Sequence, residues 1–87
     1  MKMKYNKRVL CADGFSMSVQ AFDTAYCTPR ETDADFYTHA EIGYPSHYDS
    51  LLIDYAEDPS RPTDTVYGYV PKHIIIIAIL NHGGMVD

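Results

Sequence analysis

Two cysteines and two histidines are the side chains of this sequence best suited to hold a metal ion. Successive members are separated by 15, 11 and 7 intervening residues: Cys11, Cys27, His39 and His47. Structural zinc sites place at least two ligands close together, as in CxxC or HxxxH pairs, and neither pair occurs here. We therefore expect no metal centre, and no motif indicates a cofactor.

The same cysteines are poor candidates for nucleophilic catalysis. Cys11 falls in a short apolar run, where a thiol usually behaves as a small buried hydrophobe, and Cys27 lies in an acidic loop, which disfavours a reactive thiolate. Ser16 and Ser18 alternate outward along a predicted strand, without the sharp turn that exposes a hydrolase serine. The sequence therefore predicts no catalytic residue and two reduced thiols without a disulfide.

Carboxylates dominate the remaining reactive groups. Four of the seven basic residues lie within the first eight positions, so residues 9–87 carry a formal charge of 3 − 12 = −9. Pairs such as Asp33 with Asp35 and Glu57 with Asp58 lie in strongly polar loops, which favours solvated carboxylates over general acids or bases. This charge repels phosphate backbones and membrane surfaces and attracts basic protein grooves, so we expect neither nucleic acid nor membrane as a ligand.

Tyrosine supplies most of the aromatic surface, with eight tyrosines and no tryptophan. Tyrosines border the acidic loops, and tyrosine is enriched at binding hot spots. The residues expected to bind a partner are therefore eight acids and two tyrosines: Glu31, Asp33, Asp35, Glu41, Asp54, Glu57, Asp58, Asp64, Tyr44 and Tyr55. The alternative is that the tyrosines roof a small core and that the acids keep the protein soluble.

The first element that must position these residues is a β-hairpin. An apolar run at residues 8–12 is followed by Asp13-Gly14 and by residues 15–22, where apolar and polar side chains alternate. A period of two predicts a strand with Phe15, Met17, Val19 and Ala21 toward the core. Asp-Gly is typical of a two-residue type I′ turn.

Two further strands are expected in the middle of the chain. Residues 36–42 alternate and predict a third strand, and residues 51–55 are interpreted as a short buried strand. The segments 23–35 and 56–64 are polar, acidic and contain proline, which predicts loops.

The C-terminal segment has two interpretations. Its run of isoleucines favours a strand, whereas Pro71 at the start and Gly83-Gly84 at the end are typical helix boundaries. We favour a helix over residues 71–82, apolar all round and central to the core, so that Ile77→Ala would lower the free energy of unfolding by roughly 2–4 kcal/mol.

The expected fold is a single α+β domain: a small antiparallel sheet of three to four strands with one C-terminal helix on one face. Residues 1–6 form a basic end that is either frayed or paired with the acidic loops.

Several segments resemble a known family of small proteins carried by prophages and mobile elements. They are VLCADGFSMSVQA (9–21), YCTPR (26–30), EIGYPS (41–46), YAED (55–58), VYGYVP (66–71) and HGG (82–84). Together they look most like an anti-CRISPR protein of the type I-C inhibitor group, and the resemblance covers nearly the whole chain. It implies a non-enzymatic inhibitor that binds the crRNA-guided surveillance complex in the cytoplasm of a bacterial host cell.

The charge pattern is compatible with that implication. A surveillance complex holds DNA through Lys and Arg, and a monomeric protein displaying carboxylates could occupy the same groove as a DNA mimic. Two other classes stay open: an acidic regulatory module with a different basic target, and a small enzyme.

Overall fold

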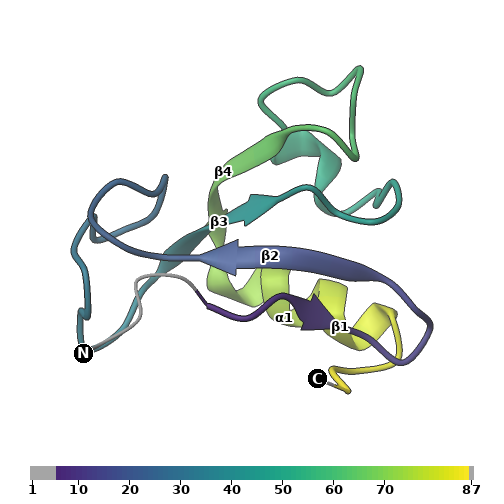
Figure 1. The fold of residues 1–87 in the computed structure, drawn as a ribbon, viewed down its shortest axis with the longest axis horizontal. Coiled ribbons are helices and arrows are strands. Elements are labelled where there is room, and N and C mark those ends of the chain that lie inside the picture. Colours follow the sequence, from purple (N-terminus) through teal and green to yellow (C-terminus); the bar gives the residue numbers. More distant parts are fainter. Residues whose placement is uncertain (1–5, 87) are drawn as a thin grey trace.

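The computed structural model describes residues 6–86 and has one antiparallel sheet with a C-terminal helix on one face (Figure 1). The sheet is a meander in the order β1-β2-β3-β4. Its elements are β1 (Val9–Leu10), β2 (Ser16–Gln20), β3 (His39–Gly43), the 3₁₀ turn η1 (Ile53–Tyr55), β4 (Val66–Pro71) and α1 (Lys72–Asn81). The predicted α+β class is confirmed, with four strands.

The predicted hairpin is present, but its turn differs from the prediction. Val9 pairs with Met17 and Leu10 with Ser16, which is shifted by one residue from the register that a two-residue Asp13-Gly14 turn predicts. Gly14 has a φ of 94°, whereas Asp13 is not among the residues with positive φ, so the turn is not type I′. The Asp13 carboxylate accepts the Phe15 N–H at 2.8 Å, which stabilises a three-residue turn with glycine at its left-handed position.

Burial follows the alternation only in the first half of β2. Phe15 and Met17 are buried and Ser16 and Ser18 are not, as predicted, but Val19 is only half-buried. The main core joins these side chains to Ile42, Leu52, Tyr67 and Val70, with Ile75 and Ala78 from the helix.

In the middle of the chain, one predicted strand has different bounds and the other is not a strand. The third strand begins at His39 and not at residue 36, and Phe36 is 68% exposed. Residues 51–55 form a turn that runs into η1 and not a strand. The cause is Asp49, whose Oδ1 accepts the N–H groups of Leu51 and Leu52 at 2.8 and 3.0 Å and so begins a helical turn.

The predicted helix is confirmed to within one residue at each end, since α1 spans Lys72–Asn81 after Pro71. Its C-terminus is closed by Gly83 and Gly84, which both have a φ of 89° and donate N–H bonds to the Leu80 and Ile79 carbonyls. This is a Schellman motif, in which left-handed glycine satisfies the last carbonyls.

The prediction that α1 is central to the core was wrong. Ile75 and Ala78 are buried, but Ile76, Ile77 and Leu80 are 49%, 43% and 66% exposed. One small sheet covers only one side of a helix, so isoleucines on the opposite side stay in solvent however apolar they are.

The predicted frayed end falls on residues 1–6, of which 1–5 lie outside the described residues. Asn6 is not frayed, because its backbone N–H donates to Gln20 Oε1 at 2.7 Å and its side-chain amide to the Val19 carbonyl at 3.1 Å. Arg8 bonds the Ser16 side chain and the Tyr44 carbonyl.

Candidate functional site

Three tyrosines form an open cleft of about 300 Å³ along the outer edge of β4. We call it the tyrosine cleft, and its lining residues are Tyr26, Tyr55, Glu57, Gly68 and Tyr69. Tyr26 comes from the first acidic loop (residues 21–38), and Tyr55 and Glu57 come from the second (residues 44–65). Each loop therefore supplies part of the cleft lining.

A β-bulge positions Tyr69 in this cleft. Ala40 pairs with Val70 and Ile42 with Tyr67, so Glu41 alone stands opposite two residues of β4, Gly68 and Tyr69. Bulges re-aim side chains, and here Tyr69 adopts a φ of 51°, which is rare for a bulky residue.

Backbone hydrogen bonds connect both loops to β4. The Tyr69 N–H donates to the Tyr26 carbonyl at 2.9 Å, and the Tyr26 N–H donates to Glu41 Oε2 at 3.0 Å. From the other loop, the Glu57 N–H donates to the Val66 carbonyl at 2.9 Å. The Tyr26 and Tyr69 ring centroids lie 6.0 Å apart with a 35° tilt. The cleft walls are thus held by main-chain bonds.

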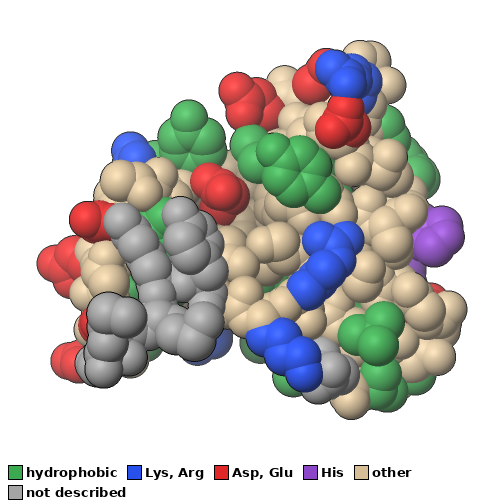
Figure 2. Space-filling model, viewed as in Figure 1, with side chains coloured by type: hydrophobic (Ala, Val, Ile, Leu, Met, Phe, Trp, Pro, Cys, Tyr) green, Lys and Arg blue, Asp and Glu red, His purple; other side chains and the backbone are tan. Residues whose placement is uncertain are grey.

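The structure separates the predicted partner-binding residues into groups. Tyr55 and Glu57 line the tyrosine cleft, and Glu41 accepts the N–H of Tyr26, another lining residue. Glu31, Asp33 and Asp35 are exposed on the first acidic loop, away from the second loop's acids. In Figure 1 the two loops leave opposite ends of the meander, and Figure 2 shows acidic side chains at the left and at the top of the same view.

The carboxylates of the second acidic loop differ in whether they bond to other residues of that loop. Asp58 is half-buried and accepts the Ser60 hydroxyl at 2.6 Å, and this hydrogen bond lowers the pKa of Asp58. Asp64 forms an ion pair with Arg61. Asp54 is exposed. Asp58 and Asp64 therefore bond within their own loop, which leaves Asp54 and Glu57 as its more available carboxylates. Tyr44 is 52% exposed but does not line the cleft.

A second constellation, which the sequence did not predict, places His82 between two carboxylates. Its Nδ1 lies 2.6 Å from Asp13 Oδ2 and its Nε2 lies 2.7 Å from Asp49 Oδ2. The ring stacks on Phe15 with centroids 3.8 Å apart and planes 5° apart. This Asp13–His82–Asp49 clamp joins the hairpin turn, the second acidic loop and the end of α1.

The electrostatics of the clamp favour a protonated histidine. Burial lowers the pKa of His82, but its hydrogen bonds to Asp13 and Asp49 outweigh burial and hold the pKa above its ordinary value. The Phe15 N–H and then His82 lower the pKa of Asp13. Because both ring nitrogens are engaged by carboxylates, the clamp is suited to joining segments and not to proton transfer.

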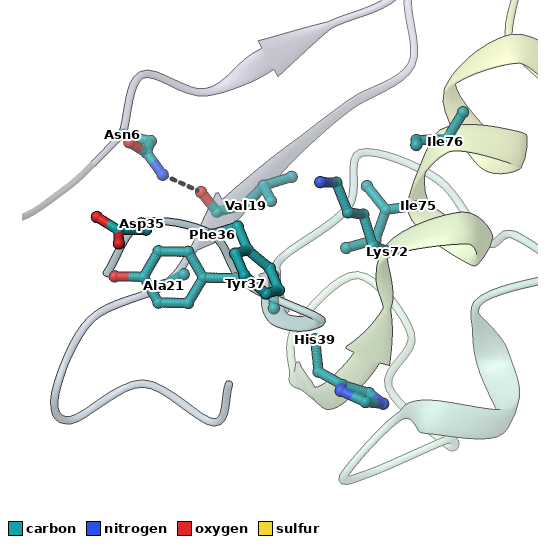
Figure 3. Close-up of a pocket in the computed structure, with 11 residues that line it drawn as sticks. Asn6, Val19, Ala21, Asp35, Phe36, Tyr37, His39, Lys72, Ile75 and Ile76 are labelled. Carbon is teal, nitrogen blue, oxygen red and sulfur yellow. Dashed lines mark hydrogen bonds between the residues drawn. The ribbon is translucent and has the colours of Figure 1, made fainter. Parts of the chain in front are cut away.

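A separate apolar groove of about 450 Å³ lies beside α1 (Figure 3). Phe36, Tyr37, Ile75 and Ile76 are among its lining side chains. In the view of Figure 3, Asp35 and Lys72 lie on either side of the two aromatic rings. Asp35 thus borders this groove and not the tyrosine cleft.

The cysteines lie in separate parts of the core. Cys11 belongs to the main cluster and Cys27 to a smaller one with Phe22 and Ala25, and both are buried free thiols. Burial raises the pKa of Cys11, with Asp13 adding to the effect, so this thiol is a poor nucleophile. Among residues 6–86, no group of three or more His, Cys, Asp or Glu side chains is arranged to hold a metal ion.

No protein-family model, curated protein or solved structure matches this chain. Within the described part of the chain, no helix has the length and apolar character needed to span a bilayer.

Proposed function

We propose that this protein is a non-enzymatic binding protein that fills a basic protein groove with its acidic, tyrosine-lined surface. The observation that carries the proposal is the tyrosine cleft, where the exposed Tyr26 and Tyr69 and the half-buried Tyr55 lie beside Glu57. Among residues 6–86, the Glu57 carboxylate has no hydrogen-bond or ion-pair partner. Aromatic anchors with unpaired charge beside them suit recognition of a basic surface.

The partner that the resemblance implies is a crRNA-guided surveillance complex of type I-C. Its DNA-binding groove presents Lys and Arg to phosphates, so carboxylates compete for the same cations. The two acidic loops point in different directions (Figure 1), which favours contact at the cleft with support from one loop over imitation of a continuous duplex. In this proposal the protein prevents DNA capture and cleaves neither guide nor target.

The test is DNA capture by a type I-C surveillance complex that has first been incubated with the protein. We expect capture to fall in proportion to the protein added, and the inhibition to weaken as salt rises, because screening shortens electrostatic reach. Glu57→Gln should raise the concentration needed for half-inhibition by roughly two- to fivefold, the scale of one exposed charge pair.

A matched control separates local charge from net charge. Asn81 is exposed at the end of α1, and Asn81→Lys changes net charge by the same single unit as Glu57→Gln. The control should inhibit like the unmodified protein. Unchanged DNA capture at saturating protein would contradict the surveillance complex as the partner, and equal effects of the two variants would contradict a role for the cleft.

A further inference from the structure

We propose that the tyrosine cleft is an aromatic site for a guanidinium group, so that one arginine side chain of the partner packs in the cleft against Tyr26, Tyr55 and Tyr69. This inference rests on the proposed function, because it names the side chain with which a basic partner would contact the cleft. Its chemistry can be tested without the partner.

The geometry suits a flat cation. Aromatic faces attract cations through their quadrupole, and guanidinium stacks on them better than ammonium does. The Tyr26 and Tyr69 rings form a tilted pair, with centroids 6.0 Å apart and planes 35° apart, so a guanidinium would lie in the cleft against this pair and not between the two rings. Gly68 lines the cleft between them, and Glu57 supplies a carboxylate at its edge.

The chain itself shows that Tyr26 accepts a guanidinium. The Arg30 guanidinium carbon lies 5.5 Å from the Tyr26 ring centroid, within the range of a cation–π contact. Arg30 is not one of the residues that line the cleft. Tyr26 therefore already makes one cation–π contact within its own loop.

The backbone of Tyr69 adopts a strained conformation in this cleft. Tyr69 is held at a φ of 51° by the bulge opposite Glu41, a conformation that a bulky residue adopts only when its surroundings impose it. Tyr26 lies directly over Gly68, where an added Cβ would approach the Tyr26 Cβ to 3.4 Å. The Tyr69 side chain is nevertheless 44% exposed, so this backbone conformation does not serve to bury the ring. Placement of the exposed ring for binding is consistent with the inference.

The experiment is a titration of isotope-labelled protein with N-acetyl-arginine amide, followed by amide chemical shifts. We expect saturable shifts at Tyr26, Gly68 and Tyr69. The neutral isostere N-acetyl-citrulline amide should produce no saturable shift, and Glu57→Gln should raise the dissociation constant roughly two- to fivefold.

Variants at Tyr69 separate the ring from the backbone. Tyr69→Asn removes the ring with a residue that tolerates positive φ, and it should weaken arginine-amide binding at least about threefold. Tyr69→Phe keeps the ring and should bind within about twofold of the unmodified protein. Tyr48→Ala, which removes a 59% exposed tyrosine outside the cleft, should leave binding unchanged.

Equal binding of the arginine and citrulline probes, the absence of any saturable shift, or unchanged binding in Tyr69→Asn would overturn the inference. The two proposals fail separately. If the protein binds the arginine amide but does not affect DNA capture, the guanidinium site is supported and the surveillance complex is contradicted as its partner. If the protein inhibits DNA capture but does not bind the arginine amide, only the inference of a guanidinium site is contradicted.

Discussion

Leu52→Ala is expected to lower the free energy of unfolding by about 3–5 kcal/mol, the largest effect of any substitution considered for this fold. Leu52 is 0% exposed and packs in the main core, although it belongs to the second acidic loop. The truncation leaves a cavity that the surrounding sheet and η1 cannot fill. Since the free energy of unfolding of a small domain is about 5–15 kcal/mol in total, the melting temperature should fall by about 10 °C or more.

Ile77→Ala is the matched control, because it removes a similar aliphatic volume from a side chain that is 43% exposed. Its cost should stay under about 1 kcal/mol, in place of the larger cost expected for a central helix. Thermal or chemical unfolding of the two variants in parallel gives the comparison. Equal destabilisation would mean that the core does not extend into the second acidic loop as described.

His82→Ala is expected to cost about 2–4 kcal/mol, because it breaks two charge-assisted hydrogen bonds and a ring stack at once. His82 contacts Asp13, Asp49 and Phe15, so its removal disconnects the hairpin turn from the second acidic loop. His73→Ala removes an exposed histidine from the first turn of α1 and should be nearly neutral. Chemical denaturation at pH 6 measures both.

The stabilisation from the clamp should depend on pH in a defined direction. The folded-state pKa of His82 is raised above 6.5, so its contribution is complete below about pH 6.5 and is lost as pH rises through the folded-state pKa. The pKa of Asp13 is lowered below 3.8, so its contribution is complete above that value and is lost as pH falls through the folded-state pKa. The difference in unfolding free energy between the unmodified protein and His82→Ala should therefore be largest from about pH 4 to 6.5 and shrink at alkaline pH. A difference that grows with pH would contradict a protonated clamp.

Local signals in the sequence account for the parts of the fold that were predicted. Asp13-Gly14 places the hairpin, and Pro71 with Gly83-Gly84 brackets the helix, because these residues restrict the backbone wherever they occur. The turn type was missed because the Asp13 side chain bonds the Phe15 N–H and its backbone N–H bonds the His82 carbonyl. The η1 turn carried a readable signal, since Asp49 precedes Leu51-Leu52 as a helix cap does, but the apolar run was interpreted as a strand.

The candidate site was predicted only in part, because it is assembled from distant segments. Tyr55, Glu57 and Glu41 were identified by residue type and charge. Tyr69 is placed by a bulge in β4 that no local pattern indicates, and its N–H bonds the carbonyl of Tyr26, a residue 43 positions earlier in the sequence. The clamp is still less visible, since His82 lies 69 residues from Asp13 and 33 from Asp49. In the sequence, each of its members is explained as a turn, cap or loop residue.

The most direct test of the central claim is amide hydrogen exchange of the protein with and without a type I-C surveillance complex. Exchange reports which backbone segments a partner covers. The proposed function predicts added protection at Tyr26, Glu57 and Tyr69 around the tyrosine cleft, with no change along α1. Added protection confined to α1 and the apolar groove, or no change anywhere at saturating complex, would contradict it.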